Sequence, residues 1–534
     1  MNFIIFAKTI YMKIHTFIAF LFILSLSCFN ATIGYCLDDS LVYIRDLTFP
    51  SSIEKTFFNK SDSASNHDLF TAFSLANINY DTSKIESNYN KYKSLLTSFE
   101  DEKFNKLKDY KRVTTIYDKA HATFFNKYEL YTVFESIFDK GIYNCVTGTS
   151  LYSLILQHFN ISYSIKETPE HVYLIAYPEN RSIKLESTDP KSGYTFYTQQ
   201  SKEKFVEYLK SEKIISINDI STIGIDSLFE KYYFANNSVT PKQLVAIQYS
   251  NNAIYQLNDN KNELALNQIL KSYYLYQSTK TKYLLYNTLL QLISKTNYKT
   301  EADWGYYILM SRFSNTLISS ENLRDEFSRL TNKLLIEQTD TILYKKAYEK
   351  IISNISDSTL KKNIMFVYGF EMGRMYLVFE NPSQAFPFLE QANKCQPNNY
   401  QAERFMVDAY LSSLKNIKND KDLLFPIEHF LQRHNSIHDN KKLISILLNI
   451  YSNLSNNALI KGSIKEGEQY LDKFEQTKSK FPDITFDGIT VESLYTSWAA
   501  KYFSKNKAKA QGIIKRGLKL DPKSKRLQDS LKMF

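Results

Sequence analysis

The stretch Gly141-Ile-Tyr-Asn-Cys145-Val-Thr-Gly-Thr-Ser150 decides how the rest of the chain is organised, because the character of the sequence changes there. It opens an apolar helix whose buried face is predicted to be Leu151, Leu154, Ile155 and Phe159. Three short runs rich in β-branched and aromatic residues follow, at 161–165, 171–177 and 182–186. Such runs predict strands. We therefore expect one α+β unit inside an otherwise helical chain.

Three side chains of this unit have the order needed for thiol chemistry. Cys145 opens the helix, where unpaired backbone N–H groups favour a thiolate. His171 begins a strand that returns towards the helix start, so its ring could take the thiol proton and later protonate a leaving group. Glu186 and Asp189 compete to orient that ring, and residues three apart on a strand point to opposite faces. We prefer Glu186, because it lies inside the strand-like run whereas Asp189 precedes a proline at its exit.

These motifs resemble the transglutaminase-like core of the papain-like fold. The matching features are Asn144-Cys145 at a helix start, Pro169-Glu-His171-Val at a strand start, and Leu185-Glu186-Ser-Thr188. Members of that family share a Cys, His and Asp triad and act as protein-crosslinking acyltransferases, amidases or peptidases, and some have lost the cysteine and serve as binding domains. The resemblance implies that Cys145 is the nucleophile, His171 the base and Glu186 the orienting acid.

This chain departs from the family pattern at two points. The family usually has aspartate where Glu186 stands. It also commonly has an aromatic residue soon after the cysteine and the histidine, where this chain has Val146 and Tyr173.

Composition favours several helical units and a solvated surface. The 534 residues predict three to four units at about 150 residues each, and 13 glycines with 11 prolines favour helices with short connections. The net charge of +10 contains no dense basic run, which argues against nucleic-acid binding. The sequence has neither a Gly-rich phosphate loop nor histidines or cysteines at metal-ligand spacing. We therefore predict no cofactor and no metal.

The N-terminus predicts export. The apolar run from Phe17 to Leu26 follows Lys13 and His15 and is shorter than the roughly 20 residues that span a bilayer. We interpret 1–36 as a signal peptide whose start could be Met12. A second interpretation is a lipoprotein signal with a lipid on Cys28. Four cysteines are too few for a disulfide scaffold, and Cys395, in an apolar helical context, is predicted to be buried.

Residues 241–534 carry an internal repeat. Small residues and a proline recur seven and five positions apart, with substitutions in one copy, at Ala385, Ala392 and Pro397, at Ala510, Gly517 and Pro522, and at Ala265, Ser272 and Gln277. Gly373 and Tyr376 precede the first copy, and Tyr470, Thr477 and Pro482 suggest a degenerate one. This spacing resembles the tetratricopeptide repeat, in which small residues let paired helices cross closely. The resemblance implies an α-solenoid with a concave surface.

The predicted fold is mostly α. It consists of the signal segment 1–36, a helical N-terminal region 37–140, a transglutaminase-like core 141–235 and the repeat region 241–534. One hypothesis is an exported cysteine enzyme, periplasmic or envelope-associated, that acts on amide bonds while the repeats bind a protein or peptide. The alternative is an inactive core serving as an envelope scaffold through its repeats. In either case the expected membrane contact is a lipid on Cys28.

Overall fold

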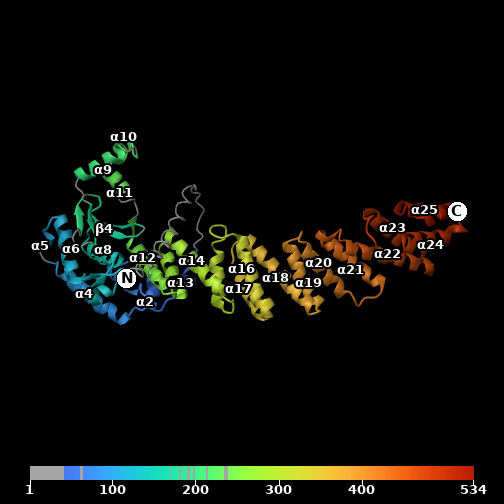
Figure 1. The fold of residues 1–534 in the computed structure, drawn as a ribbon, viewed down its shortest axis with the longest axis horizontal. Helices are drawn as coiled ribbons and strands as arrows, with labels where there is room; N and C mark the ends of the chain where they lie inside the picture. The colour runs from blue at the N-terminus through green and yellow to red at the C-terminus, as the bar shows by residue number, and fades with distance from the viewer. Residues whose placement is uncertain are drawn as a thin grey trace, which may run out of the picture. The chain divides into compact units, whose positions relative to one another are not determined.

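The chain forms two compact units, Met1–Asp46 and Leu47–Phe534. The computed structural model describes residues 41–59, 64–100, 102–168, 170–179, 182–188, 193–196, 199–211, 214–233 and 238–533. In the first unit these residues include a single 3-10 turn, Ile44–Asp46. The predicted signal segment with Cys28 and Cys36, and the alternative acid Asp189, lie outside the described residues. The described chain is mostly helical, with one small sheet region (Figure 1).

Short helices make up most of the N-terminal region, as the apolar spacing predicts. They are α2 Ser52–Asn59, α3 Asn66–Leu75, α4 Thr82–Thr97, α5 Glu102–Asn105, α6 Asp109–Phe124 and α7 Ser136–Lys140. The prediction of an all-helical region is wrong at β1, Lys127–Tyr128, which pairs in parallel with β2, Ile142–Tyr143. A strand of two residues is too short to show alternation in the sequence.

The α+β unit consists of one helix and a five-stranded antiparallel sheet. Helix α8 spans Cys145–His158, as predicted. The strands, in the sheet order β6-β5-β4-β3-β7, are Tyr194–Phe196, Ile183–Leu185, Val172–Ala176, Tyr163–Glu167 and Ser238–Val239. The three predicted strands are thus present with shifted ends, whereas β6 and β7 were missed. The fifth strand also lies beyond the core boundary that we set at 235.

Helices cover both faces of this sheet. The central strand β4 is buried along its whole length. Helix α8 packs against β4 on one side. On the other side, Tyr173 and Ile175 pack against Phe229. Because successive side chains of a strand point to opposite faces, β4 is held between two helical layers.

The second layer is a group of three helices, α9 Gln199–Ser211, α10 Ile217–Ile223 and α11 Ile225–Tyr233. Helix α10 begins at a capping box in which the side chains of Ser216 and Asp219 bond each other's backbone N–H groups. Two buried lysines form ion pairs with this group of helices. Lys166 of β3 bonds Glu230 of α11, which ties the group to the sheet. Lys202 of α9 lies 3.0 Å from Asp226 of α11, which ties two of the helices to each other.

From Pro241 onwards the structure is a series of helices, many of them packed as consecutive pairs (Figure 1). The pairs α12 with α13, α18 with α19, α22 with α23 and α24 with α25 make the most extensive contacts. The elements are α12 Pro241–Asn258, α13 Asn262–Leu275, α14 Thr279–Lys295, α15 Glu301–Ser311, α16 Ser320–Thr331, a π-helical segment Asn332–Glu337, α17 Thr341–Ile352, α18 Ser358–Val378, α19 Pro382–Cys395, α20 Tyr400–Ser413, α21 Asp420–Arg433, a 3-10 turn Asn435–Ile437, α22 Lys441–Lys461, α23 Ile464–Lys480, α24 Val491–Phe503, α25 Lys507–Leu520 and α26 Lys525–Met533.

The small residues of the predicted repeat lie where helices meet. Ala385 and Ala392 are fully buried in α19. A Cβ atom on Gly373 of α18 would lie 2.4 Å from Cγ of Leu389, so a larger residue there would push this leucine out of its place. Small side chains therefore allow close helix packing at these positions.

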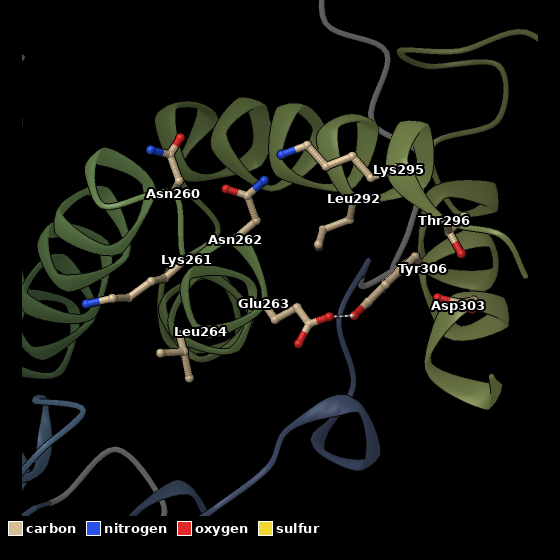
Figure 2. Close-up of a pocket in the computed structure, with 10 residues that line it drawn as sticks. All are labelled: Asn260, Lys261, Asn262, Glu263, Leu264, Leu292, Lys295, Thr296, Asp303 and Tyr306. Atoms are coloured by element: carbon tan, nitrogen blue, oxygen red, sulfur yellow. Dashed lines mark hydrogen bonds between the residues drawn. The ribbon is translucent and has the colours of Figure 1, made fainter. Parts of the chain in front are cut away.

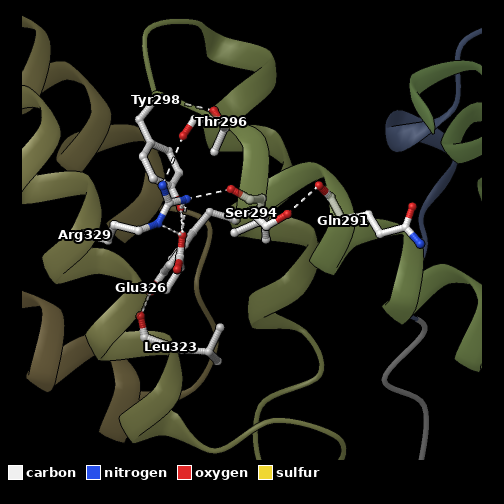
Figure 3. Close-up of polar contacts among 9 residues, drawn as sticks. Gln291, Ser294, Thr296, Tyr298, Leu323, Glu326 and Arg329 are labelled. Atoms are coloured by element: carbon white, nitrogen blue, oxygen red, sulfur yellow. Dashed lines mark hydrogen bonds and ion pairs between the residues drawn. The ribbon is translucent and has the colours of Figure 1, made fainter. Parts of the chain in front are cut away.

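Between α14 and α16 the repeat spacing is lost, and a polar network holds the helices instead (Figure 3). Arg329 of α16 donates to the carbonyl oxygens of Ile293 (2.6 Å) and Thr296 (3.1 Å), which end α14. Its guanidinium also bonds Glu326, which accepts a hydrogen bond from Tyr298. The arginine thus supplies donors to helix-end carbonyls that lack partners within the helix.

A buried ion pair joins the N-terminal helices to the repeat region. Lys271 Nζ of α13 lies 2.7 Å from Glu54 Oε1 of α2, and both side chains are only 1% exposed. Tyr249 of α12 donates a further hydrogen bond of 2.7 Å to the same carboxylate. The first repeat-region helices therefore share a polar core contact with α2.

Candidate functional site

The N-terminus of α8 is fixed by a capping box around Asn144. The Asn144 Oδ1 atom accepts a hydrogen bond from the backbone N–H of Thr147, and Thr147 Oγ1 accepts one from the N–H of Asn144, each at 2.9 Å. Cys145 is the first residue of the helix. Its thiol therefore stands beside the first-turn N–H groups, which carry the positive end of the helix dipole.

His171 lies immediately before β4, in a closed turn. Its carbonyl oxygen accepts hydrogen bonds from the backbone N–H (2.8 Å) and the hydroxyl (3.1 Å) of Thr168. Helix α8 is tied to the same strand, because Thr149 Oγ1 donates to the carbonyl oxygen of Val172 at 3.3 Å. This packing brings the start of α8 and the start of β4 together, so that the Cys145 side chain lies close enough to the His171 ring to raise its pKa.

Glu186 lies one residue past β5, and its backbone is held on both sides. Its N–H donates to the carbonyl oxygen of Gly193 at 2.8 Å, and its carbonyl oxygen accepts a hydrogen bond of 2.7 Å from the hydroxyl of Tyr117. The carboxylate faces His171, with Oε1 and Oε2 lying 2.9 and 2.8 Å from Nε2. Since Nε2 is engaged by the carboxylate, Nδ1 is the ring nitrogen left for the thiol.

The carboxylate has further partners that fix its orientation. Thr188 donates to Oε1 through its hydroxyl (2.7 Å) and its backbone N–H (3.2 Å). Lys184 Nζ lies 3.3 Å from Oε2 and also stands over the Tyr173 ring. A Cβ atom on Gly148, in the first turn of α8, would lie 2.7 Å from Cβ of Ser187. The glycine therefore allows the segment that carries Glu186 to approach the helix.

The electrostatics of the three groups are mutually dependent. The hydrogen bond with Cys145 and then that with Glu186 raise the pKa of His171 to about 9, against the effect of burial. Burial alone would raise the pKa of Glu186, but the bonds from His171 and Thr188 outweigh it and lower the pKa to about 2. A protonated imidazole paired with an ionised carboxylate is therefore the state of this pair at neutral pH.

The structure thus brings together the three side chains selected from the sequence, Cys145, His171 and Glu186. Their exposed fractions are 9% for the Cys145 residue and 28% and 13% for the His171 and Glu186 side chains. The thiol is thus buried and the ring and the carboxylate are largely shielded from water, which strengthens their electrostatic coupling. Cys395 differs, because burial raises the pKa of its thiol at the end of α19.

Two tyrosines near the thiol were missed by the sequence reasoning. Tyr128 of β1 stands beside Tyr143 in the parallel pair, two residues before Cys145. Tyr255 comes from α12, and its hydroxyl accepts a hydrogen bond of 3.5 Å from the side chain of Asn144. Burial raises the pKa of both tyrosines, and the charge of Cys145 adds to the effect in each case. No sequence signal links residues so far apart in the chain.

A second candidate site is a cavity of about 450 Å³ in the repeat region (Figure 2). It lies among α13, α14 and α15 and is lined by side chains of both charges, including Lys261, Lys295 and Asp303. Tyr306 donates a hydrogen bond of 3.3 Å to Glu263 across it. Burial, followed by the charge of Glu263, raises the pKa of Tyr306 to about 12.

Within the described residues, no three His, Cys, Asp or Glu side chains gather as a metal ion would require. The same part of the chain contains no helix long and apolar enough to cross a membrane. No protein-family model matches the sequence, and no curated protein matches it.

Proposed function

We propose that this chain is an exported cysteine enzyme of the transglutaminase-like type, acting on amide bonds by acyl transfer or hydrolysis. The observation that carries the proposal is the bond between His171 Nε2 and the Glu186 carboxylate, with the Cys145 thiol at the same ring. A nucleophile, a base and an orienting acid in contact form the arrangement that activates a thiol.

In the first half-reaction, Cys145 Sγ attacks the amide carbonyl carbon as a thiolate, its proton having already passed to His171, which is protonated at neutral pH. The C–N bond then breaks, His171 returns the proton to the departing amine, and a thioester on Cys145 remains. In the second half-reaction, water or another amine attacks the thioester carbon. His171 removes its proton and passes it to the departing thiolate, which gives hydrolysis or transfer.

Glutamate in place of the family's aspartate is compatible with this chemistry. The longer side chain starts one residue past β5, and both its oxygens reach the ring at hydrogen-bond distance. Thr188 and Lys184 hold the carboxylate in place. These contacts support an orienting role for Glu186 in this chain.

We further propose that the helices of residues 241–534 form a tetratricopeptide-like solenoid that binds a protein or peptide. Close helix crossings at Gly373 and at the buried alanines of α19 support the repeat interpretation. The polar cavity around Glu263 and Tyr306 is a candidate contact for such a partner. Export through the segment 1–36, with or without a lipid on Cys28, completes the proposal.

The experiment measures alkylation of Cys145 in the full chain by iodoacetamide at pH 7, mapped by mass spectrometry. We expect Cys145 to react at least tenfold faster than the same thiol in urea, and faster than Cys395, which serves as an internal control. His171→Gln should remove this difference in rate between the folded and the unfolded chain. Equal rates in the folded and unfolded wild-type chain would refute the assignment of Cys145 as the nucleophile.

The alternative is an inactive core in a scaffold, and the extent of the helical region is what favours it. Affinity capture from the source cell's envelope separates the two, because Cys145→Ala removes catalysis and leaves the helices intact. A cellular phenotype that survives Cys145→Ala but requires residues 276–534, beyond the end of α13, would support the scaffold.

A further inference from the structure

A residue of the repeat region reaches the N-terminal cap of the helix that carries Cys145. The Tyr255 hydroxyl, from α12, donates a hydrogen bond of 2.8 Å to the carbonyl oxygen of Leu130. The Asn144 amide donates to the same carbonyl oxygen at 3.1 Å and to the Tyr255 hydroxyl at 3.5 Å. Tyr255, Leu130 and Asn144 therefore form a closed set of three polar contacts.

These contacts hold the Asn144 side chain in a single orientation. The residue is 1% exposed, its Oδ1 caps the backbone of Thr147, and its Nδ2 is directed at Leu130 and Tyr255. Asn144 directly precedes Cys145, so a rotation of its amide would move the first turn of α8. Buried polar groups whose donors and acceptors are all used hold a single geometry better than partly satisfied ones.

Helix α12 holds the loop that carries Leu130 at further points. The Gln248 amide reaches the carbonyl oxygen of Thr132 at 3.5 Å, and the Asn258 amide reaches the Tyr131 hydroxyl at 3.4 Å. The rings of Tyr131 and Tyr255 meet edge to face, with centroids 4.7 Å apart. The loop beside Cys145 is thus placed by one face of the first repeat-region helix.

We propose that Tyr255 is a positioning residue of the Cys145 site, so that the repeat region completes the site instead of being an appended binding module. Tyr255 acts through Asn144 and Leu130 by fixing the start of α8. The inference rests on the proposed function, because it assumes that Cys145 is the nucleophile.

A matched control is available in the next helix. Tyr276, just past α13, also bridges the repeat region and the core, since its hydroxyl donates a hydrogen bond of 3.1 Å to Glu167 of β3. Tyr255→Phe and Tyr276→Phe each remove one hydroxyl at this interface. Only the first removes a contact with the residue before Cys145.

The test measures the alkylation rate of Cys145 by iodoacetamide between pH 5.5 and 9.5, together with the thermal midpoint, for the full wild-type chain and both variants. We expect Tyr255→Phe to slow alkylation about fivefold, the factor that one ordinary hydrogen bond represents. Its pH profile should also shift, whereas Tyr276→Phe should keep the wild-type profile. Equal profiles in the two variants, whatever their thermal midpoints, would overturn the inference.

A double-mutant cycle with Asn144→Ser tests the route, because serine keeps a helix cap and loses the amide donor. If Tyr255 acts through Asn144, Tyr255→Phe should have little further effect in that background. A full, additive effect would contradict the positioning role. A different result would contradict the proposed function: in the wild-type chain, Cys145 would react no faster in the folded state than in the unfolded state.

Discussion

The coupling between His171 and Glu186 gives the sharpest prediction, and Glu186→Gln is the perturbation. Glutamine keeps the size of the side chain but removes the negative charge that both oxygens direct at Nε2, at 2.9 and 2.8 Å. The raised pKa of His171, about 9, depends first on the bond with Cys145 and then on that with Glu186. The substitution should therefore lower the pKa without abolishing the shift.

The magnitude follows from the strength of the lost contact. A hydrogen bond to a charged group contributes about 1.5–3 kcal/mol. One pKa unit corresponds to about 1.36 kcal/mol of differential interaction. Glu186→Gln should thus lower the pKa of His171 by about one to two units, and the rate advantage of Cys145 in alkylation should become smaller at neutral pH.

Nuclear magnetic resonance of chains with ¹⁵N-labelled histidine measures the titration directly, and His171→Gln assigns the signal among the eight histidines. Glu100→Gln is the matched control, since Glu100 makes a looser contact of 3.6 Å with His158 at the surface. A wild-type His171 titrating near its ordinary pKa of about 6.5 would refute the reasoning. So would a Glu186→Gln variant titrating within a few tenths of a unit of wild type.

Three further outcomes follow. His171 has a raised pKa of about 9, so it should stabilise the fold fully below about pH 6.5 and lose this effect as the pH rises through 9. The effect is measured as the difference in melting point between the wild type and His171→Gln. Gly148→Ala should force the segment at Ser187 away and slow alkylation of Cys145, whereas Gly512→Ala, with nothing within 4 Å, should not. Lys271→Met should leave the Glu54 carboxylate buried without its cation and cost about 3–5 kcal/mol of stability, seen as a lower apparent melting point by calorimetry.

The parts of the site that are local in sequence could be predicted from it. The helix start at Cys145 follows from a capping asparagine before an apolar run. The preference for Glu186 is based on a strand running to residue 186, whereas β5 ends at Leu185, one residue before it. Among the described residues, Glu186 supplies the carboxylate that lies beside the His171 ring.

Contacts between distant segments could not be predicted. Tyr117 supports the Glu186 carbonyl from 69 positions away, and Tyr255 reaches Asn144 across 111. A single sequence carries no signal of such pairing, because each tyrosine looks like one more member of an apolar helical stripe. The short strands β1, β6 and β7 were missed for a related reason, since two or three residues show no period.

The ion pair between Glu54 and Lys271 decides where this chain can be cut. A fragment ending at residue 240 would contain all five strands of the sheet, because the last of them in the chain ends at Val239. That fragment would keep the buried carboxylate of Glu54 and lose both Lys271 and Tyr249, which bond it. The smallest piece that keeps this core contact whole runs through the end of α13 at Leu275.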